Sequence, residues 1–256
     1  MNAALRHRFV YPAAGPFTGR LEPRRLPTGV LRSPDNVKIA PEALPFVLPF
    51  ALASISLLAL QRTGWAMLVA LCAIALLLFF RIPDRPELAD PEVVVAPASG
   101  WVTRIDHVEA PELGSGRFHR VVIFLSVFDV HVQRSPVAGE VVASRYRRGR
   151  KVAAFRSDAG EVNESLLTVL RRPNGDLVGV RQIAGLLARR VVSYLEVGRR
   201  VRRGELMGLI KFGSRVDLLL PEAYEIQIRV GDHLLEGATI AARARSPRSG
   251  EESDPS

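Results

Sequence analysis

The segment Lys211-Phe212-Gly213-Ser214-Arg215 stands between an apolar run and the strand-like sequence Val216-Asp217-Leu218-Leu219-Leu220. Glycine adopts backbone angles that are closed to other residues, and it leaves its own carbonyl carbon unshielded. In a strained turn the hydroxyl of Ser214 can reach that carbonyl and act as an intramolecular nucleophile. The alternative is an ordinary Gly-Ser turn between two strands, which is the interpretation that the dipeptide alone favours.

The composition describes a folded chain with a strong positive charge. Of its 256 residues 48% are hydrophobic, which is enough for the core of one ordinary domain with further segments. The net charge of +9 indicates an anionic partner, and because no basic motif is interleaved with aromatic residues, a membrane surface is favoured over nucleic acid. The single cysteine, Cys72, lies in an apolar run and supports neither a disulfide framework nor a cysteine-based metal site.

Two apolar runs precede the larger part of the chain. Residues 1–41 are rich in arginine and proline, are expected to be irregular, and lack the order of segments of a signal peptide. The runs 44–60 and 65–80 are slightly short of the about 20 residues of a membrane helix, so residues 42–81 fit two tight spans or a re-entrant helical hairpin. A buried soluble hairpin is the alternative. Basic residues at both outer ends place the following domain at the cytoplasmic face of the cell (inner) membrane.

After a proline-rich hinge at 82–86, short β-branched runs alternate with Gly and Pro. This pattern predicts a mainly β domain over 92–243, of sandwich or barrel-sandwich type, in a chain that is α+β as a whole. One helix is predicted at 183–190, with 191–193 open to a strand, and 244–256 read as a disordered tail. Similar Val-Gly turns at 197–204 and 230–237 are typical of lipoyl-like hairpins. The predicted strands are 92–96, 100–108, 120–125, 139–145, 165–171, 206–211, 216–220 and 225–230.

Several short sequence blocks are informative only in combination. They are Ala96-Pro97-Ala98-Ser99-Gly100, the run 123–136 that contains Asp129-Val130-His131-Val132, the pair Asn163-Glu164, the run 182–190, and Ile210-Lys211-Phe212-Gly213-Ser214-Arg215-Val216-Asp217. In this order, over roughly residues 80–240, they resemble the short form of the phosphatidylserine decarboxylase proenzymes.

The resemblance implies a self-processing enzyme that converts phosphatidylserine in an anionic membrane to phosphatidylethanolamine and CO2. It implies that Ser214 attacks the carbonyl of Gly213, that the ester eliminates, and that hydrolysis leaves a pyruvoyl group at residue 214. Residues 1–213 and 214–256 then form a heterodimer of β and α chains cut from one precursor. The pyruvoyl ketone would capture the substrate amine and accept the electrons released with CO2, and no metal is implied.

His131 and Arg134 are the further candidate site residues. His131 lies in an apolar run beside Asp129, where a neutral imidazole can relay a proton during elimination or after CO2 leaves; a core histidine bonded to the backbone is the alternative. Long-form relatives carry a histidine where this chain has Arg134. A guanidinium cannot act as a base, so Arg134 is either a ligand of the anionic substrate or part of a structural ion pair. The histidines in polar contexts, His107, His119 and His233, receive no role.

Ser99 is a departure from the family pattern, which has at this place an aspartate thought to be the base of self-cleavage. Asp106 is seven residues further along and would lie on the opposite face of a strand unless a bulge intervenes, so the base stays unassigned. Two other functions stay open. One is a non-enzymatic membrane adaptor with a lipoyl-like β-domain, in which Gly213-Ser214 is only a turn, and the other is a decarboxylase of a related phosphoserine lipid.

Overall fold

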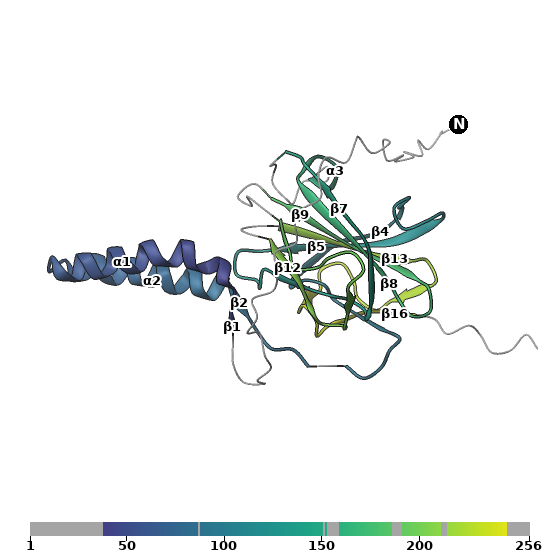
Figure 1. Ribbon diagram of the computed structural model, residues 1–256, viewed down its shortest axis with the longest axis horizontal. Coiled ribbons are helices and arrows are strands. Elements are labelled where there is room, and N and C mark those ends of the chain that lie inside the picture. Colours follow the sequence, from purple (N-terminus) through teal and green to yellow (C-terminus); the bar gives the residue numbers. More distant parts are fainter. Residues whose placement is uncertain are drawn as a thin grey trace, which may run out of the picture.

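The computed structural model describes residues 38–86, 88–150, 152, 159–185, 191–210 and 214–244, and in it a helical hairpin projects from a body of β-strands (Figure 1). The helical elements are η1 (Pro41–Ala43), α1 (Leu44–Ala59), α2 (Thr63–Phe79) and α3 (Ala159–Val162). The strands are β1 (Lys38–Ile39), β2 (Arg81–Ile82), β3 (Val93–Val95), β4 (Gly100–Glu109), β5 (Arg117–Leu125), β6 (Val132–Arg134), β7 (Gly139–Arg147), β8 (Ser165–Arg171), β9 (Leu177–Ala184), β10 (Val191–Ser193), β11 (Arg200–Val201), β12 (Leu206–Ile210), β13 (Ser214–Pro221), β14 (Tyr224–Ile226), β15 (His233–Leu234) and β16 (Ile240–Ala244). The chain is therefore mainly β, as its sequence predicts.

The largest sheet has eight antiparallel strands in the order β11-β7-β8-β9-β13-β5-β4-β15 and curls into a half-barrel (Figure 1). Strand β13 lies inside it, paired with β9 on one side and with β5 on the other. Its first residue, Ser214, stands opposite Leu125 of β5 and Ala184 of β9. Because strands bind it on both sides, the backbone of Ser214 is held in place from two directions.

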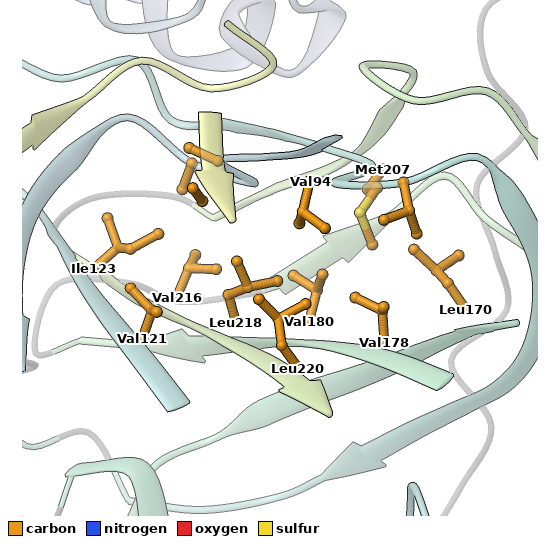
Figure 2. Packing of buried hydrophobic residues seen from close by; sticks show 14 of the residues in the cluster. Val94, Val121, Ile123, Leu170, Val178, Val180, Met207, Val216, Leu218 and Leu220 are labelled. Atoms are coloured by element: carbon orange, nitrogen blue, oxygen red, sulfur yellow. The ribbon is translucent and has the colours of Figure 1, made fainter. Parts of the chain in front are cut away.

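The main core lies between this sheet and two three-stranded sheets, β10-β12-β6 and β14-β16-β3. Figure 2 shows Val216, Leu218 and Leu220 of β13 in one row, beneath side chains of the smaller sheets such as Met207. Alternate residues of a strand share one face of its sheet. Ser214 therefore belongs to the row that faces the main core.

The two Val-Gly turns predicted from the sequence form matching hairpins. Gly198 and Gly231 have φ values of 91° and 97°, and Gly204 and Gly237 have values of 76° and 72°, a region that favours glycine. The N–H groups of Gly198 and Gly231 donate to carbonyls of β7 and β4. Strands β11 and β15 then pair with β7 and β4. The repeat is therefore structural, with one copy at each edge of the large sheet.

The helical hairpin is fastened to the body at its base. β1 pairs with β2, and the N–H of Ala40 donates to the carbonyl of Phe80 at 2.9 Å. Phe79 and Phe80 pack in a hydrophobic cluster with residues of β6 and β12, and the buried Glu42 accepts a hydrogen bond from the Tyr194 hydroxyl at 3.1 Å. The base thus belongs to the core of the body, whereas α1 has no buried residue and α2 has few.

Most predicted elements are confirmed and two are wrong. The apolar runs are α1 and α2, and the eight predicted strands correspond to β3, β4, β5, β7, β8, β12, β13 and β14 with shifted ends. Residues 38–39, expected to be irregular, form β1. The helix expected from Ile183 is wrong at its start, because Ile183 and Ala184 end β9, and a strand buried on both faces lacks the polar alternation that separates strand from helix. The remainder of that helix, 186–190, and the segments 1–37 and 245–256 lie outside the described residues.

Candidate active site

Ser214 carries a buried hydroxyl. The residue is fully buried, and its Oγ has no hydrogen-bond partner within the described part of the chain. A buried polar group without a partner costs about 1–3 kcal/mol, so it calls for an explanation, and a reactive role is one of the standard ones. The oxygen is free to attack a neighbouring carbonyl carbon. Gly213, whose carbonyl is the expected target, lies outside the described residues.

His131 is a buried imidazole in the loop between β5 and β6. Its Nδ1–H donates to the carbonyl of Asp129 at 2.8 Å, which fixes the tautomer and leaves a lone pair on Nε2. Nε2 is buried and has no partner among the described residues. Burial lowers the pKa of His131 from 6.5 to about 4, although the bond to Asp129 opposes the shift. His131 is therefore a neutral base at pH 7, and the ring of Phe79 lies against it at a centroid distance of 4.0 Å.

Two chain segments bring Ser214 and His131 to the same end of the body. The segment that ends at His131 begins at Leu125, the partner of Ser214 in β5. The segment that ends at Ser214 begins at Ile210, whose N–H donates to the carbonyl of His131 at 3.2 Å. Four residue steps separate Ile210 from Ser214, at most about 14 Å of extended chain. The candidate base therefore lies beside Ile210, whose Cα is at most about 14 Å from that of Ser214.

A pair of buried amides supports the backbone of His131. The Nε2–H of Gln133 donates to the His131 carbonyl at 2.9 Å, and the Nε2–H of Gln182 donates to Oε1 of Gln133 at 2.7 Å. Gln182 lies in β9 opposite Val216 of β13. The amides thus connect the loop of His131 to the strand beside that of Ser214. Sequence reasoning gave neither glutamine a role, and the only available signal was an amide inside each apolar run.

Asp129 organises the turn before His131. Its carboxylate accepts hydrogen bonds from the N–H and the hydroxyl of Ser126, each at 2.8 Å, and from Nε2–H of His233 at 2.7 Å. Burial raises the pKa of Asp129, but the hydrogen bonds from His233 and Ser126 outweigh burial and leave this pKa below its usual value. His233 also packs edge-on against Trp101. His233, which received no role from the sequence, reaches this site because β15 pairs with β4.

A buried carboxylate stands beside the serine that departs from the family pattern. The Ser99 hydroxyl donates to Oε2 of Glu236, and the N–H of Glu236 donates to Oγ of Ser99 at 3.1 Å. Arg85 donates to both oxygens of Glu236 at 3.0 and 2.9 Å. Ser99 and Glu236 are both fully buried. The carboxylate missing at residue 99 is therefore present nearby, and its source, 137 residues away, could not be foreseen without the fold.

Arg134 is buried in β6 and bonded mainly to the backbone. Its guanidinium donates to the carbonyls of Gly204 at 2.8 Å and Pro83 at 2.5 Å, and its Nε lies 4.0 Å from Oε1 of Glu236. Burial lowers the pKa of Arg134, a shift that Glu236 opposes. These contacts favour the structural alternative over the role as a substrate ligand.

Asp106 could replace the family aspartate only if a bulge interrupts the strand after residue 99. Such a bulge is present in β4, between Val102 and Arg104. Its carboxylate nevertheless accepts hydrogen bonds from Nε and Nη2 of Arg120 at 2.8 and 2.5 Å, and its side chain is partly exposed. A partly exposed carboxylate that is already bonded to Arg120 is not placed to serve buried chemistry. Asp106 therefore stays a poor substitute for the family aspartate.

Arg215 and Asp217 form a buried ion pair on the face of β13 away from the main core. Arg215 Nε and Nη2 donate to the two oxygens of Asp217 at 2.6 and 2.9 Å. Gly160 of α3 leaves room for the guanidinium, because a Cβ there would lie 3.2 Å from its Nη2. Breaking such a pair leaves an uncompensated buried charge, so the loss of either side chain alone should destabilise the fold.

The lowered pKa of His131 makes stability depend on pH. The folded value is about 4 and the unfolded value 6.5, so between these values the unfolded chain binds more protons and stability falls as pH falls. The expected loss from pH 7 to pH 4 is about 3 kcal/mol. Thermal unfolding of the detergent-solubilised chain measures it, with His131→Asn as the comparison, because asparagine keeps a donor for the Asp129 carbonyl and does not titrate. An unchanged pH dependence in His131→Asn, or a changed one in the control His107→Asn, would contradict this origin.

The fold and site define a β-protein with a buried serine hydroxyl and a buried, neutral histidine at the same end of the body. Comparison with known proteins then identifies its family. The family model described as phosphatidylserine decarboxylase matches residues 73–242. The chain is 45% identical over 207 residues to the phosphatidylserine decarboxylase proenzyme of Symbiobacterium thermophilum, covering 80% of this chain and 95% of that protein. Proteins of the same name from Nitrobacter winogradskyi and Trichlorobacter lovleyi are 43% and 38% identical, over 80% and 82% of this chain and 83% and 98% of their own lengths.

The chain therefore belongs to the phosphatidylserine decarboxylase family, a family of carboxy-lyases. The resemblance inferred from the Asp-Val-His-Val and Phe-Gly-Ser-Arg-Val-Asp blocks is confirmed. Among the described residues no group of three or more His, Cys, Asp or Glu side chains is arranged to hold a metal ion.

Proposed function

We propose that this chain is a self-processing, pyruvoyl-dependent enzyme that decarboxylates phosphatidylserine to phosphatidylethanolamine. The observation that carries the proposal is the buried Ser214 hydroxyl at the start of β13, which lacks a partner among the described residues and lies in the segment that matches the family. In a non-enzymatic adaptor, a Gly-Ser turn would have no reason to bury this hydroxyl at a cost of about 1–3 kcal/mol. The unpartnered oxygen thus supports the enzyme over the adaptor.

The first reaction acts on the chain itself. Ser214 Oγ attacks the carbonyl carbon of Gly213, and the peptide bond breaks as an ester forms and the amine of residue 214 is released. Loss of the Cα proton of residue 214 eliminates the ester as the carboxylate of Gly213, and hydrolysis releases ammonia and leaves a pyruvoyl group at residue 214. Residues 1–213 and 214–256 then remain together as a heterodimer.

His131 is the proposed proton acceptor. Its Nε2 lone pair is available, because Nδ1–H is engaged by Asp129, and its low pKa keeps the imidazole neutral. Glu236 is a weaker candidate, since Arg85 and Ser99 both donate to its carboxylate. The same Nε2 can return a proton to the substrate carbon after CO2 leaves.

A pyruvoyl group at residue 214 supplies a ketone that captures the substrate amine and withdraws electrons as CO2 departs. The surroundings of Ser214 fit such a group, because the residue is fully buried and its side chain faces the apolar core side of β13. The role of Arg134 as a ligand of the anionic headgroup stays a prediction. A higher KM with little change in kcat for Arg134→Gln would support it.

The proposed location of the enzyme is the cytoplasmic face of the inner membrane. Helices α1 and α2 project from the body (Figure 1), and their large apolar side chains, including Leu58, Trp65 and Leu71, are exposed by 59–65%. Apolar surface of this extent is unfavourable in water. The helix at Pro41–Ala59 is long and apolar enough to cross a membrane, and the 17 residues of α2 extend for about 26 Å, close to the about 30 Å of a hydrocarbon core. These features support a bilayer-inserted hairpin.

Excision of the hairpin should release the body from membranes while preserving self-cleavage. Residues 44–78 would be replaced by four Gly and Ser residues, which span about 14 Å, more than the 8–10 Å between packed helices. The excision keeps Ala43 and Phe79, which belong to the body's core, and the contact between the tilted rings of Phe79 and His131. The measurement is the share of the protein that sediments with membranes at high salt. High salt weakens the remaining attraction between basic residues and anionic lipid, which is about 1 kcal/mol per basic residue. Salt-resistant retention in the pellet would contradict the role of the hairpin.

The proposed activity is tested by incubating the purified full-length chain with phosphatidylserine vesicles in detergent. The expected products are phosphatidylethanolamine and CO2, and the protein should show two chains by intact mass. A processed protein that leaves phosphatidylserine unchanged but decarboxylates another phosphoserine lipid would favour that alternative. A protein that stays whole and inactive would favour the adaptor.

A further inference from the structure

An apolar turn lies at the base of the helical hairpin, on the loop that leads to His131. Val127 and Phe128 are exposed by 51% and 84%, the latter the largest value among the exposed large hydrophobic side chains of the described residues. The turn between Ser126 and Asp129 is closed by a hydrogen bond from the N–H of Asp129 to the carbonyl of Ser126 at 3.1 Å. Val127 and Phe128 thus form its tip. We name residues 126–129 the apolar turn.

The apolar turn is held in its exposed position. The Asp129 carboxylate binds the N–H and hydroxyl of Ser126 at one end of the turn, and it binds His233 of β15 across the sheet edge. A mobile loop could fold an exposed phenylalanine back onto the body, whereas a turn braced in this way keeps it presented. Single exposed apolar residues are ordinary, whereas two adjacent ones held at the tip of a braced turn form a small apolar patch that suits an apolar partner surface.

A single arginine links the apolar turn to the hairpin. Arg81 Nη1 donates to the carbonyl of Leu78 at 2.6 Å, and Arg81 Nη2 donates to the carbonyl of Phe128 at 3.1 Å. Leu78, in the last turn of α2, is itself 56% exposed. The tip of the apolar turn and the last turn of α2 are therefore joined through one guanidinium group and lie at the same level of the molecule. An arginine at this level suits the anionic headgroups of a membrane.

From this arrangement we propose that the apolar turn inserts its Val127-Phe128 tip into the lipid bilayer beside the hairpin. This inference rests on the proposed function, which places the enzyme at a membrane surface. If the hairpin occupies the bilayer up to Leu78, then Phe128 lies at the boundary between headgroups and acyl chains, where exposed aromatic side chains are favourable. The same loop continues to His131, whose Nδ1–H is bonded to Asp129. One braced loop therefore both contacts the bilayer, through its tip, and holds His131, the proposed base.

The position of the turn is tested with an environment-sensitive label. In a Cys72→Ala background, which removes the chain's one cysteine, Phe128→Cys carries the fluorophore NBD, and the full-length protein is reconstituted in vesicles of phosphatidylcholine and phosphatidylglycerol. The matched control is Ser115→Cys, an exposed position in the connection between β4 and β5, at the other end of β5. Lipids with a spin label near the headgroup should quench position 128 at least about twofold, since interfacial groups lie about 5–10 Å deep. Position 115 should be unaffected, and equal behaviour of the two labels would overturn the proposal.

A second measurement uses unlabelled protein, and it therefore excludes the explanation that the attached fluorophore itself enters the bilayer. With vesicle-borne phosphatidylserine, Phe128→Asp should lower kcat/KM about tenfold, the effect of about 1.4 kcal/mol. With a short-chain phosphatidylserine below its micelle concentration, Phe128→Asp and the parent should be equal, and Ser115→Asp should match the parent on both substrates. Equal losses on both substrates would overturn the proposal in favour of a folding defect. A parent inactive on both substrates would refute the proposed function, and the label experiment would still decide the position of the turn.

Discussion

Replacement of Ser214 by alanine is expected to leave the chain as one uncut polypeptide with no decarboxylase activity. The Oγ of Ser214 is both the proposed attacking atom and the oxygen that leaves with the Gly213 carboxylate in the elimination that forms the pyruvoyl group, and alanine has no such oxygen. The change is also mild for the fold. Ser214 is fully buried and its hydroxyl has no partner among the described residues, so its removal forfeits no described hydrogen bond and relieves a desolvation cost of about 1–3 kcal/mol.

Intact mass measurement reads out this prediction, because the parent should show a fragment of residues 214–256 and the alanine variant should not. Ser214→Cys is the matched control, since it keeps a nucleophile of similar size and should be cut in part. A thermal midpoint of the alanine variant close to that of the cysteine variant would show that both are folded. Appearance of the 214–256 fragment from Ser214→Ala would refute the proposed nucleophile.

Replacement of Glu236 by alanine should lower the free energy of unfolding by about 3–5 kcal/mol, the usual cost of leaving buried charges uncompensated. Glu236 is fully buried, and Arg85 donates to both of its oxygens at 3.0 and 2.9 Å. Arg134 lies 4.0 Å from the same carboxylate. Thermal or denaturant unfolding measures the loss. The exposed Glu222→Ala should change stability by less than about 0.5 kcal/mol, and a similarly small effect at Glu236 would contradict the role assigned to this network.

The contact between Ser99 and Glu236 makes a paired test available. Ser99→Asp alone restores the residue type of the family but places a second carboxylate against Glu236, so it should destabilise the chain and force one of the two groups to bind a proton. Ser99→Asp combined with Glu236→Ser transposes the two residues and leaves one carboxylate near Arg85. The double variant should recover about 2–3 kcal/mol relative to the sum of the single changes. Additive losses would show that the two positions do not share one carboxylate role.

Several site features were accessible to the sequence because they are local. The Asp-Val-His-Val and Phe-Gly-Ser-Arg-Val-Asp blocks pointed to Ser214 and His131, and the family is confirmed. The roles of these two residues and of Arg134 stay predictions. The helices were predicted with nearly their observed bounds, since a continuous apolar run of this length needs no tertiary information.

Other features could not be predicted from the sequence, because they depend on contacts between distant parts of the chain. The segment at Ile183 was taken for a helix because a strand buried on both faces has the same apolar texture, and only its pairing with β8 and β13 resolves the ambiguity. His233 received no role, although its Nε2–H lies 2.7 Å from Asp129. Its neighbours in the chain are polar, and the contact that matters is set by the register of β15 on β4.

The sequence by itself determined the mainly β class, the two apolar helices and the family, because each depends on residues close together in the chain or on short blocks in a fixed order. The tertiary structure alone decided that the carboxylate beside Ser99 comes from Glu236, that Arg134 is bonded to the backbone, and that Phe128 lies level with the last turn of α2. The physical reason is that burial and ion pairing depend on the surroundings in space. Strand register and the folding of the chain onto the hairpin base bring together residues that are more than a hundred positions apart.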